Sequence, residues 1–112
     1  MLSRNKEVVY FLAAPHHPEV HSPEARGSLI TVKVSEKERP AYLAFRTSAQ
    51  ASRVIASQSG YYVIASTDLT PGHCADFSSR RILFLQTDED VDQFLGNRAT
   101  FPYKKHLVRF HA

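Results

Sequence analysis

The residues best suited to chemistry gather in two histidine-containing stretches. The first, residues 16–21, has the sequence HHPEVH and supplies His16, His17 and His21 beside one carboxylate. Imidazole and carboxylate groups are ligands for zinc, nickel and copper, so this stretch is a candidate metal site. Its spacing matches no established zinc pattern, and the neighbouring prolines oppose a helix that would align two of the histidines. The simpler interpretation is a solvated polar loop.

The second stretch, residues 72–76, places His73 beside the only cysteine, Cys74. A catalytic cysteine needs a base positioned by the fold, and a histidine adjacent in sequence rarely has suitable geometry. If the loops 14–27 and 67–80 converge, they would instead build one shared ligand or metal site. The alternative is a partly buried free thiol in a turn, which requires no function.

A third candidate is the C-terminal segment, in which cations alternate with rings. Lys104, Lys105 and Arg109 lie among phenylalanine, tyrosine and histidine residues. Nucleic-acid surfaces combine cations for phosphates with rings for stacking, so these three residues form a candidate surface for nucleic acid or another anion. Lys and Arg on an edge strand also protect against edge-to-edge pairing, and the strand expected at 81–85 lacks the glycine and spaced aromatics of an RNA-recognition signature.

No other motif assigns a reaction. The chain contains no phosphate-cradling glycine loop, nucleophile elbow or zinc-finger spacing. The acidic residues of 88–92 are explained by their place in the first turn of an expected helix, where they oppose the helix dipole. We therefore assign no metal and no cofactor, and the lack of a recognisable catalytic motif favours a non-enzymatic role.

Two capped helices organise the expected fold. The sequence from Thr47 to Gln50 matches a capping box, apolar residues follow at helical spacing, and Gly60 supplies a stop. Thr87 repeats this arrangement as the N-cap of a second helix that ends near Gly96. Each helix directly follows a short apolar strand, 42–45 or 82–85. The expectation is that both helices cover the same side of one sheet.

Alternation and β-branched residues predict further strands at 8–13, 29–34, 61–65 and 106–110. The order βββαββαβ indicates an α+β fold, with a mixed or antiparallel sheet of about six strands and two helices on one face. Segment 41–111 follows the βαββαβ order of a ferredoxin-like unit, preceded by a β-hairpin with a long loop. In an alternative topology, the first three strands form a meander that opens a mixed sheet.

Length and composition describe a single domain, residues 1–112. Hydrophobic residues make up 43% of the 112 and charged residues 22%, which are typical globular values. The single cysteine excludes an intramolecular disulfide and favours a reducing cytoplasm. The apolar run 8–14 is expected to be a strand, and no run is long enough to span a membrane. The net charge of +3 gives only mild attraction to polyanions.

Function is predicted from the ratio of helices to strands. Two short helices cannot shield six strands, so we expect an apolar sheet face to remain exposed and to favour association. The chain is then a binding module that self-associates as a homodimer, or meets another protein, through that face. One alternative is a ligand-binding or metal-binding protein or enzyme with a site between loops 14–27 and 67–80. A second is a weak nucleic-acid binder through the basic C-terminal strand.

Overall fold

A computed structural model describes residues 2–3, 8–14, 28–35, 37, 40–56, 60–69 and 81–111. These residues form an α+β fold, as expected, in which two α-helices and two short 3-10 helices accompany a mixed sheet. The helices are α1 (Ser48–Ile55), α2 (Asp88–Gly96), η1 (Ser66–Asp68) and η2 (Tyr103–His106). The strands are β1 (Leu2–Ser3), β2 (Tyr10–Ala14), β3 (Ser28–Leu29), β4 (Thr31–Val32), β5 (Ala41–Phe45), β6 (Tyr62–Ala65), β7 (Arg81–Leu85) and β8 (Leu107–His111).

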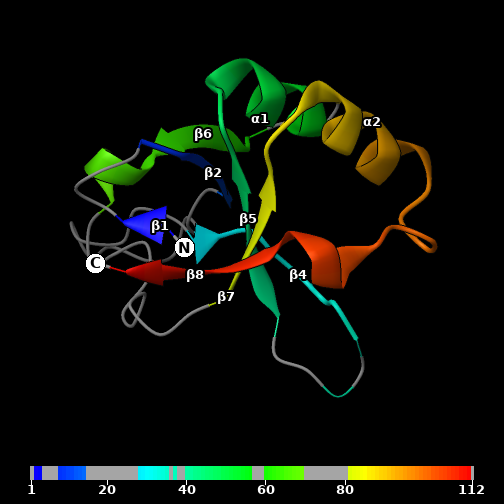
Figure 1. Cartoon of the computed structure of the whole chain (residues 1–112). Helices are drawn as coiled ribbons and strands as arrows, with labels where there is room; N and C mark the ends of the chain where they lie inside the picture. Colours follow the sequence, from blue (N-terminus) through cyan, green and yellow to red (C-terminus); the bar gives the residue numbers. More distant parts are fainter. Residues whose placement is uncertain are drawn as a thin grey trace.

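A parallel pair, β5 and β7, forms the centre of the sheet (Figure 1). β8 pairs antiparallel with β7, and the short β1 runs parallel to β8 at that end of the sheet. On the other side of β5, β2 pairs antiparallel with β5, β3 and β6. The apolar segments predicted as strands therefore all form strands, with 29–34 divided into the shorter β3 and β4.

The strand pairing follows the meander alternative only in part, because β2 also pairs directly with β5 and segment 29–34 does not separate the two. β2 pairs with β3, and β4 pairs with β5, each time antiparallel. The ferredoxin-like arrangement predicted for 41–111 is not supported, because β6 pairs with β2 instead of β7, and β7 runs parallel to β5 where that arrangement is antiparallel. The pairings make β6 and β7 point the same way, and strands of equal direction cannot be joined as a tight hairpin.

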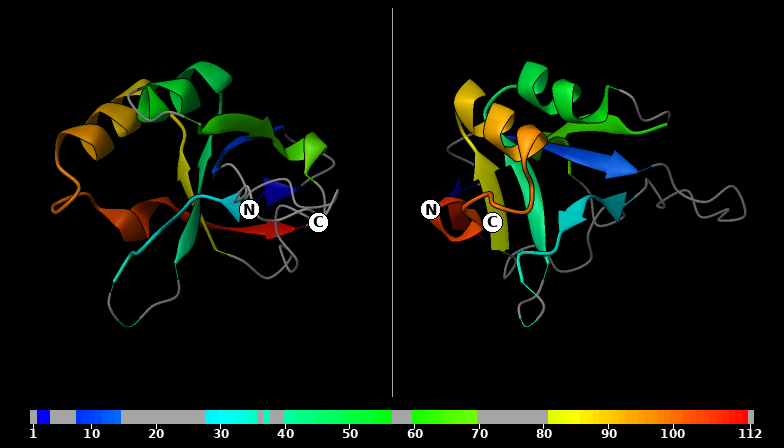
Figure 2. Two further views of the ribbon diagram at one scale, coloured as in Figure 1. Left: turned by 180° about the vertical axis from the view of Figure 1, so that it is seen from behind. Right: turned by 90° about the vertical axis from the view of Figure 1, so that its right-hand side faces the viewer.

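Both helices begin as the sequence predicts. The Thr47 hydroxyl accepts a hydrogen bond from the Gln50 amide at 3.2 Å, and the Gln50 side chain accepts one from the Thr47 amide at 3.1 Å. Thr87 and Asp90 form the equivalent reciprocal pair, each bond measuring 3.1 Å. Because β5 and β7 are parallel neighbours, the two helices start at the same end of the sheet. They lie side by side on one face (Figures 1 and 2).

Side chains pack on both faces of the sheet. The cluster on the helix side includes Leu43, Leu83, Val91 and Phe94, all at most 1% exposed. The expectation of an exposed apolar face on the other side was wrong for the described residues. Their side chains there are buried as well, among them Val9, Phe11, Ala13, Ala44, Ile82 and Phe84.

The twist of the sheet contributes to this burial. Tyr62 of β6 and Val108 of β8 come from strands far apart in the sheet, yet both pack against the same buried cluster. β2 and β8 also run across the direction of β5 and β7 (Figure 1). The sheet therefore curls around the side that lacks helices, as strongly twisted sheets do. Within the described residues, no helix is long and apolar enough to cross a membrane.

Candidate interaction surface

The histidine-rich candidates fall outside the part of the chain that the structure describes. His16, His17, His21, His73 and Cys74 all lie in stretches 15–27 and 70–80, which are not described. The shared ligand or metal site between loops 14–27 and 67–80 therefore remains a prediction. Within the described ranges, no group of three or more His, Cys, Asp or Glu side chains could hold a metal ion.

The basic C-terminal residues lie on the surface. Lys104 and Lys105 are exposed on η2, and Arg109 is exposed on β8, where it pairs in register with Arg81. Phe101, in contrast, is only 6% exposed. In this segment the three cations are therefore exposed while the Phe101 ring is buried. Lys104, Lys105 and Arg109 remain a predicted anion surface.

The rings of this segment pack on one another. The Phe101 ring meets Phe94 edge-on, with 5.5 Å between centroids, and stacks on His106 at 4.9 Å. Tyr103 contacts both phenylalanine rings edge-on, and its hydroxyl donates a hydrogen bond to the Arg98 carbonyl at 2.9 Å. Such T-shaped contacts are favourable aromatic geometry. The cluster ties η2 to α2, and Phe101 is not available to stack on bases.

A polar network joins the N-termini of the two helices through Gln50, which is 7% exposed. Its side-chain oxygen accepts hydrogen bonds from the backbone amides of Arg46 and Thr47. Its side-chain nitrogen donates to the Gln86 carbonyl at 3.3 Å and to the Asp88 carboxylate at 3.1 Å. All the hydrogen-bonding capacity of the amide is used. This network therefore stabilises the helix pair and leaves no free group for a ligand.

An exposed ion pair also connects the two helices. Arg53 of α1 donates a hydrogen bond to Asp92 of α2, and this bond raises the pKa of the arginine. The acidic residues of α2 thus oppose the helix dipole, complete the N-terminal cap through Asp90 and bind α1 through Asp92. This finding agrees with the structural role assigned to 88–92 from the sequence.

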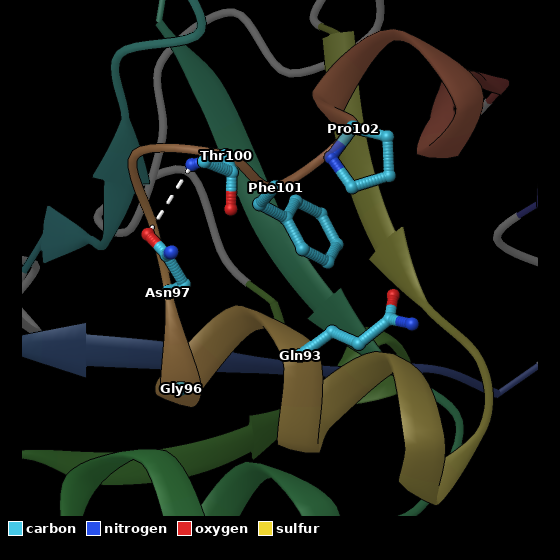
Figure 3. A pocket seen from close by; sticks show the side chains of 6 residues that line it. All are labelled: Gln93, Gly96, Asn97, Thr100, Phe101 and Pro102. Carbon is cyan, nitrogen blue, oxygen red and sulfur yellow. Dashed lines mark hydrogen bonds between the residues drawn. The ribbon is translucent and has the colours of Figure 1, made fainter.

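Two hollows flank the segment that follows α2. The larger, with a volume of about 420 Å³, is open, and its lining is uncharged (Figure 3): Gln93, Gly96, Asn97, Thr100, Phe101 and Pro102. Asn97 closes the turn by accepting a hydrogen bond from the Thr100 amide at 3.4 Å. The smaller, of about 150 Å³, presents both polar and apolar surface and is lined by α1, the strands beside it, Tyr61 and Arg98. Neither brings together groups that could perform acid-base or nucleophilic catalysis.

Gly96 gives a test of the packing at the larger hollow. A Cβ built on Gly96 meets no atom within 4 Å, and its φ is not positive. Gly96→Ala should therefore stabilise the protein by about 0.4 to 1 kcal/mol, because alanine restricts the unfolded chain. Gly60 is the matched control, because its φ of 88° disfavours alanine and Gly60→Ala should destabilise. Urea unfolding of both variants checks this, and a loss of stability for Gly96→Ala would contradict it.

The edge of the sheet at β6 has a feature that the sequence did not reveal. The Ser66 amide donates to the Val9 carbonyl at 2.8 Å, so backbone groups of Ser66 point toward β2. Backbone groups alternate in direction along an antiparallel strand, so those of Tyr62 and Ile64 also point toward β2. The amides and carbonyls of Tyr61, Val63 and Ala65 then point away from the sheet.

Among the residues that the structure describes, this outer edge lacks the usual protection against pairing. Within the described part of the chain, β2 is the only strand that pairs with β6. Residues 60–67 have the sequence GYYVIAST, with no charge and no proline. Natural edge strands are usually blunted by charged side chains, proline or a covering element. At the opposite end of the sheet, β1 pairs with β8, which carries the exposed Arg109.

No protein-family model matches the chain, and no curated protein or solved structure matches it significantly.

Proposed function

We propose that this protein is an interaction module that self-associates as a homodimer, and that the outer edge of β6 is its contact surface. The observation that supports the proposal most strongly is the direction of the backbone groups of Tyr61, Val63 and Ala65 away from β2. A strand from another chain would satisfy these groups by extending the sheet. The proposal keeps the self-association expected from the sequence and moves it from a sheet face to a sheet edge.

The side chains of β6 suit such a contact. Tyr61, Tyr62, Val63 and Ala65 are partly buried, so a second strand beside them would cover the apolar surface that they still expose. Aromatic and β-branched residues also make favourable cross-strand pairs. Because the edge is short, we expect modest affinity, with a dissociation constant on the order of micromolar.

The proposal places the protein in the cytoplasm and gives it no catalytic role. A reducing compartment suits a chain with one cysteine. The ligand site between loops 14–27 and 67–80, and anion binding by Lys104, Lys105 and Arg109, stay alternatives of a different class. Neither depends on β6, so a defect confined to the β6 edge distinguishes self-association from both.

Ala65→Pro tests the proposal with little disturbance of the monomer. Ala65 has φ −75° and ψ 149°, which proline adopts without strain, and the amide that proline removes points away from β2. The wild-type chain should sediment as a dimer at about 100 μM, well above the expected dissociation constant, whereas Ala65→Pro should remain monomeric. Analytical ultracentrifugation over a concentration series measures both.

Ala65→Ser is the matched control, because it changes the same side chain and retains the amide. It should dimerise like the wild type, while urea unfolding should show that Ala65→Pro is folded. A wild-type protein that stays monomeric throughout the series would overturn the proposal. An equally dimeric Ala65→Pro variant would move the contact away from β6 and overturn it too.

A further inference from the structure

We infer that the strand added to β6 is β6 of a second copy, running antiparallel, with the twofold axis passing beside Val63. This inference rests on the proposed self-association and specifies its geometry. It follows from the symmetry of a dimer, from the direction of the backbone groups at the edge, and from the limits of the extended segment.

Symmetry restricts which residues can face each other. When two copies of a strand extend one sheet around a twofold axis, the strands are antiparallel and the axis is perpendicular to the sheet. Side chains directly opposite each other in an antiparallel pair lie on the same face, and faces alternate along the strand. One residue of β6 must therefore face its own counterpart.

The ends of the extended segment select that residue. Gly60, with φ 88°, breaks the extended backbone before Tyr61, and η1 begins at Ser66. The segment between these breaks is centred on Val63. An axis beside Ile64 would place Tyr61 opposite Thr67, which lies within η1. With the axis beside Val63, the outward groups of Tyr61 face those of Ala65 from the other copy.

This register satisfies the free backbone groups together. Val63 faces Val63 of the second copy, and each Tyr61 faces the other copy's Ala65. All of these residues direct their amides outward, so the Val63 pair exchanges two hydrogen bonds and each Ala65 amide donates to a Tyr61 carbonyl; the Ala65 carbonyl is also the first acceptor of η1. A shift by two residues would leave one end of the short edge without a partner strand.

The side chains also fit this register. Val63 packs with the helix-side cluster and Tyr62 with the opposite cluster, so alternation places Tyr61 and Ala65 on the helix side. The large Tyr61 then meets the small Ala65 on one face, and Tyr62 meets Ile64 on the other. Residues 61–65 carry no charge, so no like charges meet across the axis.

Disulfide trapping tests the register in a Cys74→Ser background. Facing residues of a hydrogen-bonded antiparallel pair have Cα atoms about 5.5 Å apart, within the range a disulfide spans. Val63→Cys should therefore form a covalent dimer under mild oxidation. Tyr61→Cys alone should not, because its two copies would lie roughly 13 Å apart along the strands. A mixture of Tyr61→Cys with Ala65→Cys should cross-link.

The outcomes separate this inference from the proposal on which it rests. Trapping at Val63 and between positions 61 and 65 supports the register. If Val63→Cys alone is not trapped but a mixture of Val63→Cys and Ala65→Cys is, the axis lies beside Ile64 and the proposed register is overturned. A dimer by sedimentation that none of these cysteines traps would overturn the register and leave self-association standing. A monomer by sedimentation would remove both.

Discussion

Replacing Phe94 by alanine should destabilise the protein by about 3 to 5 kcal/mol, the loss typical of a fully buried aromatic ring. Phe94 is 0% exposed and lies in the cluster between the helices and the sheet. Its ring also contacts Phe101 and Tyr103 edge-on and lies 4.5 Å below the Arg98 guanidinium. Alanine leaves a cavity and removes the anchor that holds η2 against α2. Urea unfolding followed by circular dichroism measures the loss.

Leu95→Ala is the matched control for this variant. Leu95 is the next residue of α2 and is 42% exposed, so its truncation should cost less than about 1 kcal/mol. A domain of this size is stable by roughly 5 to 15 kcal/mol, so the Phe94 variant should lose a large share of its stability. Equal effects for the two variants would contradict the packing described for the helix side of the sheet.

Gln50→Glu should destabilise the protein by about 2 to 4 kcal/mol at pH 7. The substitution keeps the size of the side chain and replaces its donor nitrogen by an oxygen. That oxygen would face the Gln86 carbonyl and the Asp88 carboxylate. In the wild type, both groups accept hydrogen bonds from the Gln50 nitrogen. A buried carboxylate beside another carboxylate leaves both acceptors without a donor and adds charge repulsion.

The loss of stability caused by Gln50→Glu should diminish as the pH falls. Burial and Asp88 would raise the pKa of the introduced carboxyl group in the folded state above its unfolded value. The destabilisation is then small below the unfolded pKa and grows as the pH rises toward the folded one. Unfolding of variant and wild type at about pH 4.5 and pH 7 tests this against the ordinary glutamate pKa of about 4.3.

Gln93→Glu provides the matched control for charge. Gln93 is exposed on α2, so the same substitution there should change stability by less than about 0.5 kcal/mol at either pH. If Gln50→Glu behaved like Gln93→Glu, the network between the helix N-termini would contribute little to the fold.

Phe94 and Gln50 act within one monomer, whereas the β6 edge acts between copies. Substitutions at Phe94 or Gln50 should lower the free energy of unfolding and affect association only through loss of fold. Ala65→Pro should change association at nearly constant stability. This difference separates the residues that build the module from those that carry its proposed function.

The sequence by itself determined the elements whose causes are local. Thr47 and Thr87 stop a strand and start a helix because their hydroxyls satisfy amides three residues onward. The apolar strands before them were also predicted, since alternation and β-branched residues favour a strand within a few positions. The placement of both helices on one side of the sheet was correctly predicted as well.

Only the tertiary structure decided which segments meet. β2 lies between β5 and β6, so β6 is an edge strand within the described ranges, and the uncharged sequence of 61–65 does not reveal that position. Gln50 was identified as a cap, but its bonds to Gln86 and Asp88 depend on α2 lying beside α1. Likewise, Phe101 turns inward because Phe94 and His106 surround it. Each of these contacts joins residues whose proximity is set by the pairing of strands, a property of the whole chain.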